Sequence, residues 1–150
     1  MKAVIEDASI RDLDRLYEIE TECFREEAFT KAQIAQLLRG YSSIGLIARV
    51  GGQIVGFVIG DIYVDGRVLQ GHICTIELLP NFRRQGIGEK LLREIEEIFR
   101  QKKVKASALE VREDNVPAIE FYRKLGYDKI GTLKNYYGSA HGLFLGKTLT

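Results

Sequence analysis

The sequence predicts a mixed α/β (α+β) fold, in which a mostly antiparallel sheet has helices on both faces and one parallel strand–helix–strand crossover. Three observations predict it. Short glycine turns join the strands of the first half, helical spacing of apolar residues follows Pro80, and a strand, a helix and a final hairpin come after that. A length of 150 residues corresponds to one domain, so we expect a single domain over residues 1–150.

The N-terminal elements are predicted from helix-capping patterns. A short strand at Val4 and Ile5 precedes a capping box at residues 9–12, which opens the first helix. A second capping box at residues 30–33 opens a short helix that ends at Gly40. The apolar faces of the two helices comprise Leu13, Leu16, Ile19 and Cys23 in the first, and Ile34, Leu37 and Leu38 in the second.

Three consecutive strands follow, and their short connections predict antiparallel pairing. We expect strands over residues 44–50, 53–61 and 69–79. Gly51-Gly52 forms a tight turn between the first two, and Asp65-Gly66 is a further turn signal before the third.

After Pro80 the pattern changes to alternating helices and strands. Residues 86–102 have helical periodicity and residues 106–111 form a strand, so residues 69–111 imply a parallel crossover. Asn115 caps the last helix, which carries Pro117 in its first turn and ends at Gly126. Residues 127–133 and 143–149 can pair as a final hairpin across the loop 134–142.

Composition excludes several classes of function. Hydrophobic residues make up 45% and charged residues 29% of the chain, as in a globular protein, and the net charge of +1 argues against a nucleic-acid binder. Cys23 and Cys74 are too far apart for a CxxC pair, so we expect free thiols and no metal site. Without an apolar signal segment or a membrane-length apolar stretch, we expect a cytoplasmic protein with no membrane partner.

The segment RRQGIG at residues 83–88 joins a strand to a helix and predicts an anion site. The first amides of a helix have no internal partner, its dipole makes that end positive, and glycines let a pyrophosphate approach the backbone. A bare Gly-x-Gly is also compatible with a simple tight turn. The segment does not match the Walker phosphate loop, because Gly-Lys-Ser/Thr is absent. It does not match the dinucleotide-binding motif either, because that motif has a third glycine.

RRQGIG resembles the Q/R-x-x-G-x-G/A signature of the GNAT superfamily of acetyl-CoA-dependent N-acetyltransferases. The resemblance covers nearly the whole chain, including the hairpin GGQIVGF, the strand GHICTIELLP, the helix IGEKLLREIE and the strand ALEVREDN. Within the superfamily, LEVREDNVPAIEFYRKLGY followed by KNYY is similar to protein N-terminal (Nα) acetyltransferases, both the RimI-type ribosomal-protein alanine acetyltransferases and the archaeal and eukaryotic catalytic subunits. The resemblance implies acetyl transfer from acetyl-CoA to a primary amine by direct attack.

The resemblance also implies where acetyl-CoA binds. The strand before the signature splays from its parallel neighbour, the pantetheine arm pairs with it, and the Leu78 amide holds the thioester oxygen as an oxyanion-hole donor. Asn115 contacts the cofactor arm, although it is also a plain helix cap. The cofactor-binding residues implied are Ile76, Glu77, Leu78, Arg83, Arg84, Gln85, Gly86, Ile87, Gly88, Glu89, Asn115 and Tyr122.

Three residues are implied as catalytic. Tyr122 matches the family tyrosine that faces the cofactor sulfur, where it protonates or hydrogen-bonds the thiolate; otherwise it is a core aromatic residue. Glu110 stands where this subfamily places its general base. His72 lies on the preceding strand, where relatives carry His or Tyr, and it is either a base or structural. His141 receives no role.

The acceptor, implied to be a protein or peptide N-terminus, is held by two loops in the relatives. Phe24, Arg25 and Glu26 belong to the loop between the first two helices, and Tyr136 and Tyr137 belong to the last hairpin. Relatives often have Pro-Trp or Leu-Pro in the first loop, whereas residues 24–29 here read FREEAF, which leaves the preferred first residue open. The ribosome or an auxiliary subunit is a further candidate partner.

Other functions stay open at this point. A GNAT enzyme of this size could acetylate a small amine such as a polyamine or an antibiotic, although the NYY segment favours a peptide. A catalytically silent acyl-CoA-binding module is a second alternative, against which the presence of Glu110 and Tyr122 argues. A nucleotide-binding module is a third.

Overall fold

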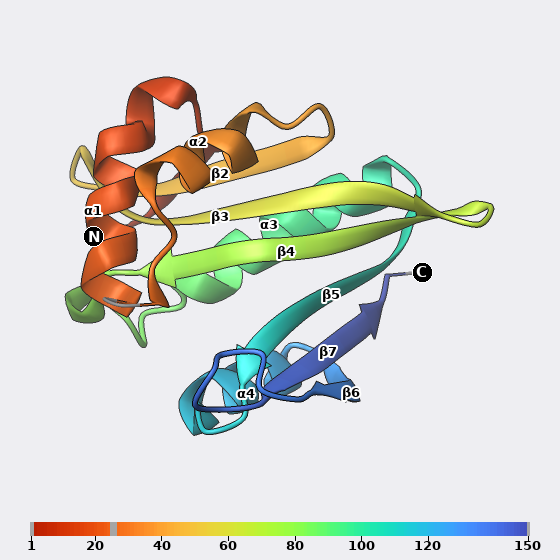
Figure 1. The fold of residues 1–150 in the computed structure, drawn as a ribbon. Coiled ribbons are helices and arrows are strands. Elements are labelled where there is room, and N and C mark those ends of the chain that lie inside the picture. The colour runs from red at the N-terminus through yellow and green to blue at the C-terminus, as the bar shows by residue number, and fades with distance from the viewer. Residues whose placement is uncertain (1, 25–26, 150) are drawn as a thin grey trace.

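The structure, a computed structural model, describes residues 2–24 and 27–149. In this part of the chain one seven-stranded sheet has the order β1-β2-β3-β4-β5-β7-β6 (Figure 1). All neighbouring strands pair antiparallel except β4 and β5, which are parallel, so the predicted fold class is confirmed. The strands are β1 (Val4–Asp7), β2 (Ser43–Val50), β3 (Gln53–Asp65), β4 (Val68–Leu78), β5 (Val104–Arg112), β6 (Asp128–Leu133) and β7 (Gly142–Thr148).

The helices follow the predicted capping patterns. Both capping boxes form: the side chains of Ser9 and Asp12 cap each other's backbone amides, and those of Thr30 and Gln33 do the same. The first helix differs from the prediction because it opens as a 3-10 turn at Ile10 before it becomes α-helical. The helices are η1 (Ile10–Asp12), α1 (Leu13–Phe24), α2 (Lys31–Arg39), η3 (Pro80–Phe82), α3 (Ile87–Gln101) and α4 (Val116–Lys124).

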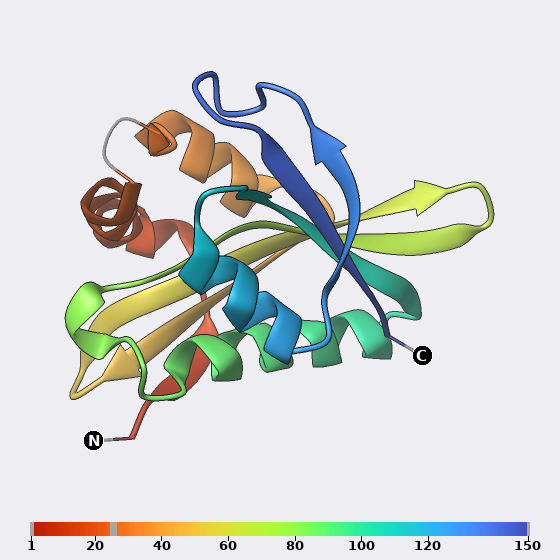
Figure 2. The ribbon, with the colours of Figure 1, turned by 90° about the horizontal axis from the view of Figure 1, so that it is seen from below.

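Two hydrophobic cores lie on opposite faces of the sheet, because α1 and α2 cover one face whereas α3 and α4 cover the other (Figure 2). The smaller core joins Leu16, Ile19 and Ile34 of the helices to Ile47, Phe57 and Ile59 of the strands. The larger core is built around α3, whose buried face comprises Ile87, Leu91, Leu92, Ile95 and Phe99. The prediction of a mixed sheet with helices on both faces is thus confirmed.

The β3–β4 hairpin is longer than predicted. β3 continues to Asp65, four residues past the predicted end, and stays paired with β4 up to the turn, where Asp65 lies opposite Val68. Gly66 closes that turn with a φ of 64°. Ile62 still packs against the core, whereas Tyr63 and Val64 beyond it are exposed.

A bulge in β4 redirects its second half. Ile59 pairs with Thr75 and Gly60 pairs with Ile73, so Cys74 is the extra residue. Ile73 packs in the core under α3, whereas the Thr75 hydroxyl lies beside Glu20 of α1. The bulge therefore turns Thr75 and Glu77 towards α1, an arrangement that strict alternation along the strand would not produce.

No helix in the part of the chain that the structure describes is long and apolar enough to span a bilayer.

Candidate active site

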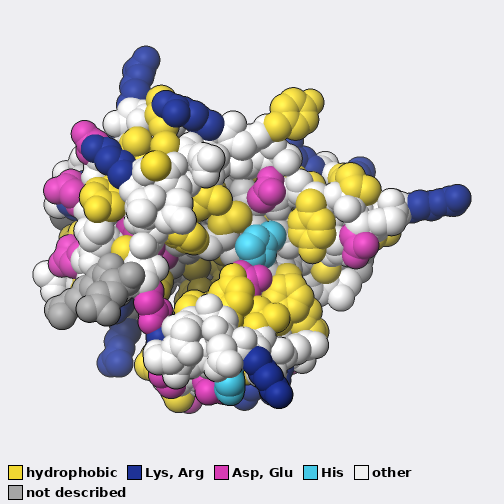
Figure 3. Space-filling view, viewed as in Figure 1, with side chains coloured by type: hydrophobic (Ala, Val, Ile, Leu, Met, Phe, Trp, Pro, Cys, Tyr) yellow, Lys and Arg dark blue, Asp and Glu magenta, His cyan; other side chains and the backbone are white. Residues whose placement is uncertain are grey.

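β4 and β5 pair over a short stretch and then diverge. The last parallel pair joins His72 to Ala108, although β4 runs on to Leu78 and β5 to Arg112. Figure 1 shows the two strands separating towards the end of the sheet where α4 lies. The surface is hollowed over this region, and a histidine and several hydrophobic side chains border the hollow (Figure 3). The predicted parallel crossover is thus present, and its strands open into a site.

The edge of β4 that faces this opening carries backbone hydrogen-bond donors. The Leu79 amide donates to the Val55 carbonyl of β3 at 2.9 Å. Because successive amides of an extended strand point to opposite edges, the Leu78 and Ile76 amides face the side from which β5 has departed. This orientation is what the predicted thioester-binding role of Leu78 requires.

The signature loop leads from β4 through η3 into α3. Arg84 and Gly86 have positive φ values of 63° and 83°, and Gly86 is the N-cap of α3 without a side-chain cap. No side chain caps the first backbone amides of α3, so these amides are available to a bound phosphate. A Cβ added at Gly88 would lie 3.4 Å from the ring of Phe121, so α4 packs directly against the loop.

Arg83 makes contacts that the sequence did not indicate. Its Nε donates to the Leu78 carbonyl at 3.0 Å, and its Nη2 lies 3.6 Å from the Cys23 sulfur. Arg83 therefore joins the end of β4 to α1. The predicted cofactor-binding residues 84–89 lie around the start of α3, as expected.

Helix α4 presents Tyr122 to the interior. Asn115 caps this helix by accepting the Ala118 amide at 3.3 Å, with a proline in the first turn. Tyr122 is buried, and its ring packs edge-on against Phe121 and Tyr127. Burial and the nearby Glu77 carboxyl raise the pKa of Tyr122, so its hydroxyl keeps its proton and can act as a hydrogen-bond donor.

Glu110 of β5 and His72 of β4 form a close pair where the two strands begin to diverge. The His72 Nε2 lies 2.8 and 3.0 Å from the two carboxylate oxygens, and the Cys74 sulfur lies 3.7 Å from Nδ1. Hydrogen bonds to Cys74 and to Glu110 raise the pKa of His72 to about 10, against the opposing effect of burial. The raised pKa favours the imidazolium form of His72 near neutral pH, a form that cannot act as a base.

The predicted acceptor residues fall in two segments, the end of α1 and the β6–β7 loop. Phe24 ends α1 and is partly exposed, whereas Arg25 and Glu26 lie outside the described residues. The rings of Tyr136 and Tyr137 pack edge-on with centroids 4.9 Å apart. Burial, Tyr136 and Glu110 raise the pKa of Tyr137 to about 12.

Arg112, two residues after Glu110, was not predicted as a site residue. Its guanidinium binds both oxygens of Asp114, contacts the Glu27 carboxylate and lies 5.7 Å from the centre of the Tyr137 ring. It therefore connects the segment after α1 to the β6–β7 loop. The arginine at the end of the strand segment LEVR was the only sign of this residue in the sequence. Its contacts with Glu27 and Tyr137 could not be predicted from the sequence.

A second omission is a buried pair of carboxyl groups next to the same opening, Glu20 of α1 and Glu77 of β4. Glu77 was predicted to bind the cofactor, but only through the backbone of the strand that pairs with the pantetheine arm. Among the described residues no group of three or more metal-ligating side chains occurs. His141 holds its own loop, since its Nδ1 accepts the Asn135 amide at 2.9 Å.

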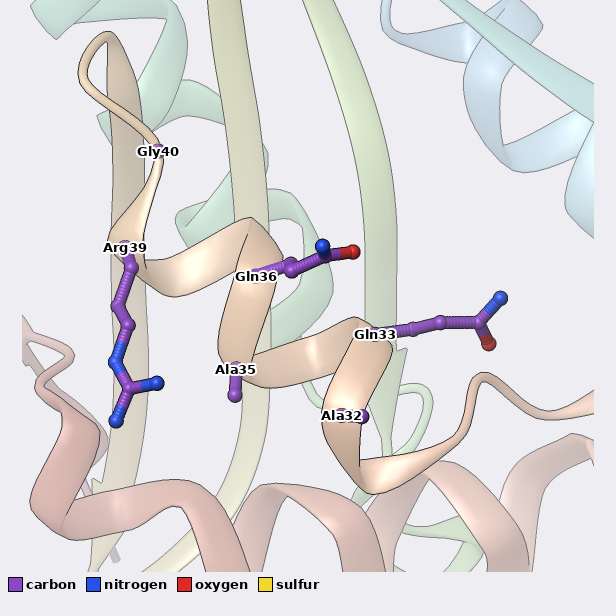
Figure 4. A pocket seen from close by; sticks show the side chains of 6 residues that line it. All are labelled: Ala32, Gln33, Ala35, Gln36, Arg39 and Gly40. Carbon is purple, nitrogen blue, oxygen red and sulfur yellow. The ribbon is translucent and has the colours of Figure 1, made fainter.

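A hollow of ≈ 480 Å³ lies along the outer side of α2, away from every predicted site residue (Figure 4). Figure 4 shows its polar side chains extending outwards from the helix rather than converging on a point. It is lined by Ala32, Gln33, Ala35, Gln36, Arg39 and Gly40. With no convergent polar groups, this surface is not a candidate for chemistry.

Comparison with known proteins extends this picture. A family model described as the acetyltransferase (GNAT) family matches residues 13–127. An N-alpha-acetyltransferase of Sulfurisphaera tokodaii is 29% identical over 153 residues, covering 94% of this chain and 89% of the relative. A candidate ribosomal-protein-bS18-alanine N-acetyltransferase of Bacillus subtilis is 31% identical over 136 residues, covering 91% of this chain and 87% of the relative.

Among solved structures, Ard1 from Thermoplasma volcanium superposes with a TM-score of 0.91 at 29% identity, covering 100% of this chain and 99% of that one.

Proposed function

The chain belongs to the acetyltransferase (GNAT) family, and from this premise we propose that it transfers the acetyl group of acetyl-CoA to the N-terminal α-amino group of a protein. Acetyl-CoA supplies the activated acetyl group in this family. Two relatives that align along almost their whole length, named for Nα-acetylation and for acetylation of a ribosomal-protein alanine, support the choice of acceptor.

The chain offers a matching site for acetyl-CoA. The unpaired edge of β4, with the Ile76 and Leu78 amides, suits the pantetheine arm, and the start of α3 at Gly86 suits the pyrophosphate. Gly86 is the N-cap of α3 with a φ of 83°, and no side chain caps the first amides of the helix. We assign residues 84–89 to the phosphates, with Arg83 bracing the strand that holds the thioester end.

The acid–base roles follow from the charge states of the site. An α-amino group has a pKa of about 8, so an acceptor enters largely as an ammonium ion. We assign Glu110 as the group that deprotonates it, because the raised pKa of His72 favours its protonated form. We assign Tyr122 to hydrogen-bond the sulfur from the opposite side, because its raised pKa keeps the hydroxyl protonated.

One observation supports the peptide acceptor most directly: Arg112, two residues after Glu110 on β5, contacts both the Tyr137 ring and the Glu27 carboxylate. The two segments assigned to acceptor binding thus meet at the end of the strand that carries the proposed base. A polypeptide entering between them would bring its terminal amine to Glu110, and its backbone would be within reach of the tyrosine hydroxyls.

The test is product mass spectrometry with acetyl-CoA and three acceptor classes. We expect acetylation of the α-amino group of free peptides, and much poorer acetylation of N-terminally blocked lysine peptides and of spermidine. If spermidine has the highest kcat/KM, the enzyme is a small-amine acetyltransferase. If acetyl-CoA binds without turnover of any acceptor, the chain is a silent acyl-CoA-binding module. Repeating the assay with ribosomes tests whether a larger assembly presents the acceptor.

A further inference from the structure

Glu20 of α1 and Glu77 of β4 are buried together beside the proposed site, with exposed fractions of 1% and 4%. The Thr75 hydroxyl lies between them, 2.5 Å from Glu77 Oε1 and 3.3 Å from Glu20 Oε1. Glu20 Oε2 accepts the Phe29 amide at 3.1 Å. The remaining oxygen, Glu77 Oε2, is buried and has no hydrogen-bond partner in the part of the chain described.

Among the residues that the structure describes, no cation is paired with these two carboxyl groups. Within the described residues neither carboxyl forms an ion pair with a lysine, arginine or histidine. The titratable groups that act electrostatically with Glu77 are Glu20 and Cys23 from α1 and Tyr122 from α4. The Arg83 guanidinium in this region is engaged by the Leu78 carbonyl and the Cys23 sulfur.

Such a pair cannot carry two negative charges, because burying an unpaired carboxylate costs several kcal/mol or more. Burial and the neighbouring Glu20 raise the pKa of Glu77 well above its usual range. In the free enzyme the two groups therefore hold one proton between them, as adjacent carboxyls in other active sites do.

The position of the pair relates it to the reaction. Glu77 directly precedes Leu78, whose amide faces the diverging edge of β4, and the bulge at Cys74 turns the Glu77 side chain towards α1. The Glu77 carboxyl is also one cause of the raised pKa of Tyr122, the residue assigned to the sulfur. Glu20 anchors Phe29, which lies in the segment assigned to the acceptor.

We propose that Glu77, supported by Glu20 and Thr75, is the cation subsite of the acceptor: an incoming α-ammonium group donates a hydrogen bond to Glu77 Oε2. The ammonium keeps all its protons in this step. Its positive charge allows the pair to ionise fully, and the proton that the two carboxyls shared is released to solvent. Glu110 remains the group that later deprotonates the amine. The subsite thus selects acceptors that arrive as cations and disfavours blocked N-termini.

This inference rests on the proposed function, but its test requires no turnover. A free-amine peptide is titrated calorimetrically into the full chain with CoA present, in two buffers of different ionisation enthalpy, which counts the protons released. We expect the wild type to release about one proton near neutral pH, and the N-terminally blocked peptide to release none. Glu77→Gln should release none and should bind the free peptide roughly 10- to 100-fold more weakly, the loss of one charge-assisted hydrogen bond.

The matched control is Glu120→Gln, which removes an equal charge from an exposed position on α4 and should behave as wild type. Equal proton release by the wild type and Glu77→Gln would overturn the proposal. The released proton would then be attributed to the His72–Glu110 pair. Peptide binding by the wild type without proton release would overturn it as well. A wild type that binds no peptide would refute the proposed function and this subsite together.

If Glu77→Gln does not fold, Glu20→Gln provides the test. The substituted amide oxygen can still accept the Phe29 amide, but the negative charge that raises the Glu77 pKa is gone. The pH range over which peptide binding releases a proton should therefore shift to lower pH. An unshifted range would overturn the proposal.

Discussion

At the scale of single residues, the charge state of His72 determines which member of the catalytic pair can act as a base. The family resemblance assigned Glu110 as the general base and left open whether His72 is a base or structural. The structure places the imidazole against the carboxylate and against Cys74, which raises the pKa of His72 to about 10. An imidazolium cannot accept a proton, so the assignment of Glu110 depends on a contact that the sequence does not encode locally.

Replacing Glu110 tests this assignment. Glu110→Gln should lower kcat at pH 7 by roughly 10- to 10⁴-fold, the range for a general acid–base group, while acetyl-CoA affinity changes little. The loss should shrink at high pH, where more of the acceptor amine is already neutral. Glu113→Gln, at an exposed position just after the same strand, should have wild-type kcat. Steady-state pH–rate profiles of the three proteins provide the comparison. Coincident acidic limbs for wild type and Glu110→Gln would return the role to His72 or to solvent.

The His72 charge state itself is open to measurement. An NMR titration of its imidazole should have a midpoint near 10, and Glu110→Gln should lower that midpoint. Because the pKa is raised on folding, charged His72 stabilises the fold fully below the unfolded value of 6.5, and this contribution is lost as the pH rises through about 10. A wild-type midpoint near 6.5 would show that the ion pair is not populated in solution.

At the scale of elements, the features predicted correctly are those that depend on residues close together in the sequence. Both capping boxes and the N-cap at Asn115 formed as predicted, because each depends on a side chain and a backbone amide no more than three residues apart. The bulge at Cys74 was missed because it depends on pairing with β3, and the overhang of β3 was missed because most of its residues are exposed. The Glu20–Glu77 pair was missed because it depends on that bulge.

The start of α3 provides a prediction at this scale. Gly86→Ala should destabilise the fold by about 1 kcal/mol, because φ is 83° there and alanine disfavours that conformation, although the added methyl group would meet no other atom within 4 Å. It should also weaken acetyl-CoA binding, because a backbone that leaves the positive-φ conformation would shift the phosphate-binding amides at the start of α3. Gly66→Ala is the matched control, with a φ of 64° and equally open space at the β3–β4 turn. Urea unfolding and calorimetric titration of acetyl-CoA should show equal stability losses but an affinity loss only for Gly86→Ala. Equal losses of acetyl-CoA affinity in the two variants would show that the phosphates do not bind at the start of α3.

At the scale of the whole molecule, a buried polar network holds the C-terminal half of the sheet against α3. The Tyr127 hydroxyl donates to Glu96 of α3 at 2.7 Å and lies 2.9 Å from the Ser107 hydroxyl of β5. Lys147 of β7 donates to the other Glu96 oxygen at 2.9 Å and lies over the Tyr127 ring. β5 and β7 are thereby held to the helix that begins at the signature loop. Since β5 meets β4 in only a short parallel stretch, this network helps to set the angle at which the two strands diverge.

Lys147→Met should therefore destabilise the whole fold, because it leaves the Glu96 carboxylate buried without its main counter-charge. Loss of one partner of a buried ion pair usually costs 3–5 kcal/mol, and we expect roughly 3 kcal/mol because Arg100 lies 4.0 Å from Glu96. Lys129→Met, at an exposed position on β6 opposite Leu145, should change the free energy of unfolding by less than about 0.5 kcal/mol. The double variant Glu96→Gln/Lys147→Met removes both charges and should recover much of the loss. Urea unfolding of the four proteins gives the comparison. A Lys147→Met variant as stable as Lys129→Met would show that Glu96 is neutral or solvated in the native state, and that β7 is held to α3 by apolar packing alone.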